Sequence, residues 1–313
     1  MRPARLARLL GTWTGPALLL ALGLVMASAL TAHGPAQRPD DDRPLVRAAL
    51  GKRLHTEGHR YGPLRGQRLR AYWYASDRAR PALAIVPGGY WSRTTDWSRW
   101  ARHYAAEGYA VFTLSYRLDG DARWPAARRD VRRALRWIRS SSRYGVSPGR
   151  VLVLGSSAGG HLAAAAATYR SGRSLTAGVV ALSPVASPYR AWRDGGRAGD
   201  SAAQVRLREN AERLVGCAPR RSDPRCWGAW RSASVKSAAS GVDDAPMLLV
   251  HARSDWVSVR HSTDLAAAER AAGMSRRDMS VCVVRGAAHG MALLDDRHVR
   301  ARVDTWLHHH GWD

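Results

Sequence analysis

Lysine and cysteine are both scarce in this chain of 313 residues. Only two lysines, Lys52 and Lys236, stand among the 49 basic residues, and the rest are arginines. Three cysteines are too few to build a small protein around disulfides. A disordered chain is also excluded, because such chains contain few apolar residues and this one is 45% hydrophobic. Length and composition therefore fit one large α/β domain or two small domains.

Acidic residues are also few, at 25, which leaves a net charge of +24. A charge of this size suggests nucleic acid or an anionic surface as a partner. In segment 126–140, however, four arginines fall opposite an apolar face, as on a solvated helix surface: Arg128, Arg132, Arg136 and Arg139. The other arginines lack the interleaved aromatic residues typical of nucleic-acid binding. We therefore expect no specific nucleic-acid partner, and a basic surface that favours anionic substrates or cell-surface polymers.

The amino-terminal segment has the pattern of an export signal. Three arginines precede an uncharged stretch over 16–29, and small residues at 27–29 or 30–32 offer a cleavage site. An uncleaved membrane anchor is the alternative, because the uncharged run over 9–32 is long enough to span a bilayer. We expect residues 1–32 to be removed and 33–46 to form a linker. The protein is then secreted, with no membrane domain left after cleavage.

Export would place the three cysteines in an oxidising compartment. Cys217 and Cys226 lie close together in a loop-like segment and could form a disulfide there. Cys282 lies in an apolar run and is expected to be a buried free thiol. No cysteine or histidine cluster has metal-ligand spacing, and the run from His308 to His310 stands at a helix end, where polar and cationic side chains are common. We expect no metal site.

Short apolar runs alternate with helical patterns along most of the chain. Strands are expected at 69–74, 82–86, 110–115, 151–154, 178–182, 247–250 and 279–284, and helices at 126–140, 161–169, 261–272 and 296–308. This alternation predicts an α/β fold with a mostly parallel sheet covered by helices on both faces. The polar, Arg- and Gly-rich segment 186–235 interrupts it. We expect a lid or insertion there, within a domain of residues 47–313.

A serine flanked by glycines follows one of the buried strands. The segment from Gly155 to Gly159 has the pattern G-x-S-x-G between a strand and a helix, which presents Ser157 on a tight turn at the carboxyl end of the sheet. The backbone N–H of Ala158, at the start of the helix, could then donate to an oxyanion. The alternative is an ordinary glycine-rich turn.

A second glycine loop, from Pro87 to Trp91, follows an earlier buried strand. Backbone N–H groups of Gly88, Gly89 or Tyr90 could add further oxyanion donors there. Without Ser157 a plain turn would be the better interpretation. Aromatic side chains in and after this loop either line a substrate pocket or pack beneath the helix that follows: Tyr90, Trp91, Trp97 and Trp100.

A base and an acid for Ser157 follow the last two strands. Asp255 comes after strand 247–250 and His289 after strand 279–284, so both lie at the same edge of the sheet as Ser157. His289 would take the serine proton, and Asp255 would orient the imidazole. Four other acids precede the strand or follow His289 too closely: Asp243, Asp244, Asp295 and Asp296. His161 and His251 are expected to be structural.

Together with Tyr116-Arg117-Leu118, these motifs resemble those of α/β-hydrolases of the bacterial acetyl esterase/lipase group, related to hormone-sensitive lipase. The resemblance covers about residues 50–310 and implies a carboxylic ester hydrolase without a cofactor. Two positions depart from the family pattern. Pro87 stands where relatives carry histidine, which changes how the oxyanion loop is braced, and Ser156 stands where many carry an acid. The Gly-Gly-Tyr-Trp form also resembles arylformamidases.

These observations predict an exported serine esterase that acts through an acyl-enzyme on Ser157. Short acyl esters are the expected substrates, including acetyl groups on polysaccharides and small aryl esters. An arylformamidase or amidase with the same residues is the first alternative. A non-catalytic hydrolase-fold protein that binds an anionic polymer is the second, disfavoured because Ser157, Asp255 and His289 are all present.

Overall fold

The computed structural model describes residues 53–312. The expected export signal, the linker and Lys52 lie outside the described residues, so cleavage and export stay predictions. Within 53–312, no helix combines the length and hydrophobicity needed to cross a membrane.

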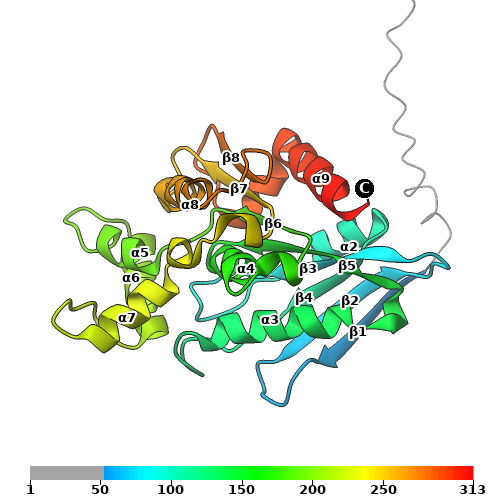
Figure 1. Ribbon diagram of the computed structural model, residues 1–313, viewed down its shortest axis with the longest axis horizontal. Coiled ribbons are helices and arrows are strands. Elements are labelled where there is room, and N and C mark those ends of the chain that lie inside the picture. Colours follow the sequence, from blue (N-terminus) through cyan, green and yellow to red (C-terminus); the bar gives the residue numbers. More distant parts are fainter. Residues whose placement is uncertain (1–52, 313) are drawn as a thin grey trace, which may run out of the picture. The chain divides into compact units, whose positions relative to one another are not determined.

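Eight strands form one sheet in the order β1-β2-β4-β3-β5-β6-β7-β8 (Figure 1). Their bounds are β1 Leu54–Arg60, β2 Arg68–Tyr74, β3 Arg80–Val86, β4 Ala110–Leu114, β5 Val146–Ser156, β6 Gly178–Leu182, β7 Met247–Ala252 and β8 Met279–Val284. β2 pairs antiparallel with both β1 and β4. From β4 to β8 all pairings are parallel. The expected mostly parallel sheet is confirmed.

Helices cover both faces of the sheet, as expected. β3 shows why, because its successive residues are buried on opposite faces: Ala82, Ala84 and Val86 in one core, Leu83 and Ile85 in the other. The first core also contains α3 (Ala126–Arg139), α4 (Ala158–Thr168) and α8 (Arg260–Ala271). The second contains α2 (Ser98–Ala106) and α9 (Arg297–Gly311). A strand that is apolar from residue 81 to 86 is stable only between two such layers.

The segment 186–235 contains three helices: α5 (Pro188–Asp194), α6 (Ala202–Val215) and α7 (Pro224–Ala233). They lie together beside α8 in Figure 1. Ser201 and Gln204 cap α6 reciprocally, and Asp223 accepts hydrogen bonds from the first N–H groups of α7. The predicted Cys217–Cys226 disulfide is present between α6 and α7. Cys282 is free, but it is only half-buried, because β8 is an edge strand.

The arginine row of α3 is less solvated than the sequence suggests. Arg128 is 5% exposed, with its guanidinium 3.6 Å from the ring centroid of Tyr169 and 4.9 Å from that of Trp124. Burial lowers the pKa of Arg128 to about 10. Arg132 donates to the carbonyls of Ala166 and Tyr169. The expectation of a wholly solvated face was wrong, because these two side chains cover the carboxyl end of α4.

Candidate active site

Ser157 sits at the turn between β5 and α4. Its backbone has φ 53° and ψ −118°, a conformation that costs energy for any residue other than glycine. Close packing around the turn holds this conformation. A Cβ atom added at Gly159 would lie 2.1 Å from the carbonyl oxygen of Val86, and one at Gly155 would lie 2.5 Å from that of Gly159. The small residues of the motif are therefore required for the elbow to form.

His289 and Asp255 form a close pair. His289 Nδ1 lies 2.9 Å from Asp255 Oδ1 and 3.1 Å from Oδ2. The Asp255 side chain is fully buried, whereas that of His289 is 22% exposed. Because the carboxylate accepts at Nδ1, the tautomer is set and Nε2 is left to act as a base. Asp255 also accepts from the N–H of Val257, which fixes the carboxylate within its loop.

The loop that carries His289 packs against the Ser157 elbow. A Cβ atom at Gly290 would lie 2.5 Å from Ser156 Oγ and 3.9 Å from Ser157 Cβ. Glycine also fits the positive φ of 60° at this position, which strains other residues. The structure thus brings together the three residues that the sequence singles out, from the carboxyl ends of β5, β7 and β8.

Ser183 joins two of these loops and was not anticipated. It follows β6, donates from Oγ to Asp255 Oδ2 at 2.5 Å, and accepts from the N–H of Gly290 at 2.9 Å. Its own backbone has a positive φ of 45°. Its position directly after a buried strand was a readable signal, because polar residues there gather at one edge of a parallel sheet.

The glycine loop after β3 lies against the elbow. A Cβ atom at Gly88 would lie 2.7 Å from the carbonyl oxygen of Ser156 and 3.2 Å from Ser157 Cβ. Ala158 is the first residue of α4, where backbone N–H groups have no partner within the helix. Gly89 has φ 123° and starts the turn that accepts from the N–H groups of Ser92 and Arg93. Backbone donors from two segments therefore flank Ser157.

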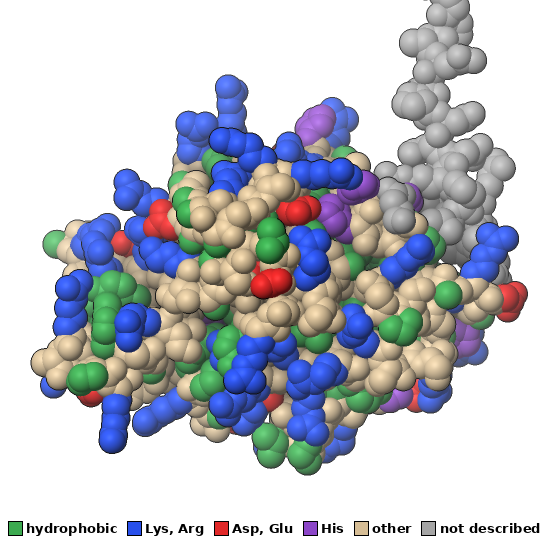
Figure 2. Space-filling view, viewed as in Figure 1, with side chains coloured by type: hydrophobic (Ala, Val, Ile, Leu, Met, Phe, Trp, Pro, Cys, Tyr) green, Lys and Arg blue, Asp and Glu red, His purple; other side chains and the backbone are tan. Residues whose placement is uncertain are grey.

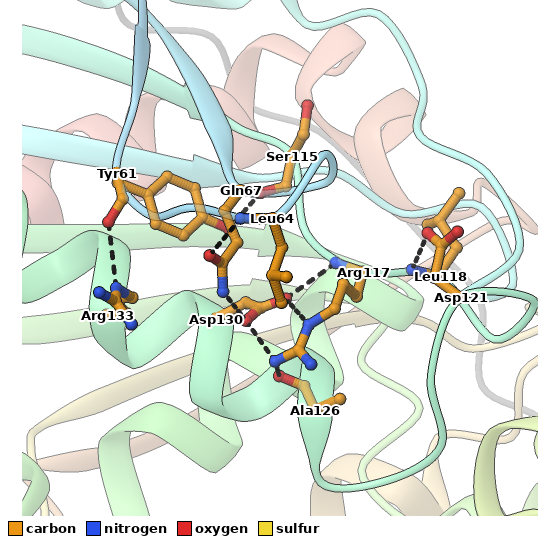
Figure 3. Close-up of polar contacts among 10 residues, drawn as sticks. All are labelled: Tyr61, Leu64, Gln67, Ser115, Arg117, Leu118, Asp121, Ala126, Asp130 and Arg133. Atoms are coloured by element: carbon orange, nitrogen blue, oxygen red, sulfur yellow. Dashed lines mark hydrogen bonds and ion pairs between the residues drawn. The ribbon is translucent and has the colours of Figure 1, made fainter.

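Tyr116 braces the glycine loop at Pro87. Its hydroxyl donates to the Pro87 carbonyl at 2.8 Å. The next residue, Arg117, binds Asp130 of α3 through its backbone N–H and its guanidinium, with contacts of 2.7 to 3.0 Å (Figure 3). Gln67 donates to the same carboxylate at 2.7 Å. The segment 116–118 is thereby fixed to α3 and holds the loop in place.

Trp91 is fully buried, so it does not line an accessible pocket as the sequence suggested. Its indole N–H donates to His161 Nδ1 at 3.1 Å, and His161 Nε2 lies 2.8 Å from the Ala233 carbonyl. Burial lowers the pKa of His161 to about 4, so it stays neutral and fits this bonding. His251 is buried between Ser262 and the Val257 carbonyl. Both histidines are structural, as expected.

Aromatic side chains instead border His289. The Trp256 ring lies 4.3 Å from the imidazole, and Tyr90 stacks on Trp256 at 5.8 Å. Trp256, which follows Asp255 directly, was not anticipated. Within 53–312, no group of three or more His, Cys, Asp or Glu is placed to hold a metal ion.

Comparison with known proteins shows that the chain is similar to esterases. The family model BD-FAE matches residues 73–187. The esterase LipC of Mycobacterium tuberculosis is 28% identical over 290 residues, which covers 87% of this chain and 68% of LipC. The esterase LipQ of the same organism is 34% identical over 116 residues, 34% of this chain and 27% of LipQ.

Solved structures show the same fold. Esterase B from Lactobacillus rhamnosis aligns over 82% of this chain and 86% of its own with a TM-score of 0.66 and 20% identity. An acetyl ester-xyloside bifunctional hydrolase from Caldicellulosiruptor lactoaceticus aligns over 78% of this chain and 88% of its own, with a TM-score of 0.60 and 22% identity. The expected resemblance, the α/β-hydrolase fold and the class of enzyme, a carboxylic ester hydrolase, are confirmed.

Proposed function

We propose that this carboxylic ester hydrolase is exported and cleaves short acyl esters through a Ser157-His289-Asp255 triad and an acyl-enzyme. The observation that carries the proposal is the 2.9 Å contact between His289 and a buried Asp255, on a loop packed against the strained Ser157 elbow. Nucleophilic catalysis requires both features, a base oriented by a carboxylate and a nucleophile presented beside it.

In the first half-reaction, Ser157 Oγ attacks the ester carbonyl carbon while His289 Nε2 takes the hydroxyl proton. The carbonyl oxygen becomes an oxyanion that accepts from backbone N–H groups of Ala158 and of the loop at Gly88 and Gly89. Collapse of the tetrahedral intermediate breaks the bond to the alcohol oxygen, which receives the proton from His289. Water then attacks the acyl-enzyme by the reverse sequence and releases the acid.

One feature supports esters of flat or cyclic alcohols. Trp256 and Tyr90 present stacked rings beside His289, where a leaving group departs. Aromatic faces pack well against aryl groups and sugar rings. Acetylated polysaccharides and small aryl esters are therefore the proposed substrates.

Export is proposed from the amino-terminal pattern and supported by the disulfide. Cys217 and Cys226 are bonded in the described part of the chain. Disulfides persist mainly in oxidising environments outside the cytoplasm. Amino-terminal sequencing of protein recovered from the culture medium tests this, and an intact Met1 would contradict cleavage.

The activity is tested with p-nitrophenyl esters of acetate, butyrate and octanoate, beside an aryl formamide. We expect rapid hydrolysis of the acetate, slower hydrolysis of longer chains, and loss of at least about 1000-fold in kcat for Ser157→Ala. The matched control is Ser156→Ala, which removes the neighbouring hydroxyl and retains activity. A wild-type protein inactive on every ester would contradict the proposal, and faster cleavage of the formamide would favour an arylformamidase.

A further inference from the structure

A cavity of about 260 Å³ lies between the insertion and the body of the domain. Its walls come from α5, α7 and the following turn on one side, and from the start of α8 on the other. The volume is close to the lower end of small-molecule sites. Six cationic side chains line it: Arg190, Arg193, Arg221, Arg231, Lys236 and Arg260.

The charges around this cavity are not balanced. One carboxylate, Asp264, lines it and pairs with Arg190 at 2.5 Å. Among the described residues, the other five cationic side chains have no ion pair. Like charges gathered around a concave surface repel one another and raise the local positive potential. Figure 2 shows Lys and Arg side chains dispersed over the visible face, so charge alone does not distinguish the cavity.

An aromatic wall does distinguish it. Tyr189 and Trp227 are both partly exposed and meet edge to face at 5.0 Å. They supply flat apolar surface beside the cations.

We propose that this cavity binds a small ring compound that carries a carboxylate or phosphate group. The anion would be held by the unpaired cationic side chains, while the ring packs on Tyr189 and Trp227. Guanidinium groups bind both carboxylates and phosphates through paired N–H donors. A uronic acid and a sugar phosphate share this chemistry.

The cavity also adjoins the catalytic loops. Arg190, Arg193 and Arg260 line a second hollow as well, which includes Asp255 and Trp256. An anionic sugar held in the cavity could therefore belong to the polymer whose ester is cleaved. That role rests on the proposed function, whereas binding of the anion does not.

Isothermal titration calorimetry of the full-length protein at 0.15 M NaCl tests binding directly. The probes are glucuronate and glucose 6-phosphate, with glucose as the neutral control. We expect at least one anion to bind at least about tenfold more tightly than glucose. The double variant Arg231→Gln/Lys236→Gln should weaken anion binding about tenfold, because both side chains are exposed and their loss leaves the fold intact.

Arg276→Gln is the matched control, since it removes an exposed charge outside the cavity and should leave affinity unchanged. The proposal is overturned if neither anion binds more tightly than glucose, or if the double variant binds like the wild type. Calorimetry requires no turnover, so this result is independent of the esterase assay.

Discussion

The Ser183 hydroxyl holds the buried carboxylate of Asp255, the residue that orients His289. The hydroxyl donates to Asp255 Oδ2 and accepts from the N–H of Gly290, so one side chain joins the loops after β6, β7 and β8. Because Asp255 orients His289, Ser183 positions the base without touching substrate.

Removing this hydroxyl should impair turnover more than binding. In Ser183→Gly the positive φ is retained without strain, while Asp255 and Gly290 both lose a partner. We expect kcat for p-nitrophenyl acetate to fall about tenfold with KM nearly unchanged. This pattern is expected when a variant loses stabilisation of the transition state but not of the bound substrate. The control is Ser254→Ala, which changes an exposed side chain in the loop that carries Asp255. An unchanged kcat in Ser183→Gly would contradict the positioning role.

The Arg117–Asp130 pair should stabilise both the fold and the oxyanion loop. In Asp130→Ala, Arg117 and Gln67 lose a buried acceptor that is 1% exposed. Because Arg117 is partly exposed, we expect a loss of about 2–3 kcal/mol in the free energy of unfolding by urea. Activity should fall in the fraction that stays folded, since Tyr116 no longer holds Pro87 firmly.

Asp121→Asn provides the comparison for that measurement. Its exposed carboxylate accepts from the N–H of Leu118 in the same segment (Figure 3). Its effect should stay below about 1 kcal/mol. Equal losses in the free energy of unfolding for Asp130→Ala and Asp121→Asn would contradict a stabilising role of the buried Arg117–Asp130 pair.

Glu269 should make stability depend on pH. Burial, and next the neighbouring Asp244, raise the pKa of Glu269 from 4.5 to about 8 in the folded protein. Between these values the folded state keeps a proton that the unfolded state releases, so stability is fully present below about pH 4.5 and falls as pH rises through 8. Glu269→Gln should lose this decline. Urea unfolding at several pH values measures it.

Glu209→Gln is the matched control, because Glu209 is an exposed carboxylate on α6. It should retain the wild-type decline in stability with pH. Parallel stability curves for the wild type and Glu269→Gln would contradict the assignment of this proton to Glu269.

The disulfide should stabilise the insertion. Cys217 and Cys226 are nine residues apart, and closing a loop of that length contributes about 2–3 kcal/mol in the chain-entropy model. Reduction with dithiothreitol should therefore lower the unfolding temperature and open segment 186–235 to limited proteolysis. Identical cleavage patterns with and without reductant would contradict this account.

The central strands were readable from the sequence because each is a short apolar run buried between two helical layers. β1 was not predicted, because Leu54–Arg60 is an almost wholly polar edge strand. The helices of the insertion were also missed, since arginines and glycines interrupt their apolar faces. The capping box at Ser201 and Gln204 was the available signal.

The site was readable where chain order and strand ends determine it. Ser157, Asp255 and His289 each follow a strand of the parallel part of the sheet, and parallel strands place such residues at one edge. The roles of Ser183 and Tyr116 depend on contacts between loops distant in sequence. The cavity beside the insertion also depends on such contacts, because the residues that line it come from 186–265. No local pattern predicts contacts of that range.

The acyl-enzyme is the central claim, and mass spectrometry tests it most directly. The protein is treated with p-nitrophenyl acetate, quenched in acid within the first turnovers and digested. The account predicts an acetyl group, about 42 Da, on the peptide that contains Ser157, lost on longer incubation and absent from Ser157→Ala. Accumulation of the same adduct on another residue, with hydrolysis intact in Ser157→Ala, would contradict it.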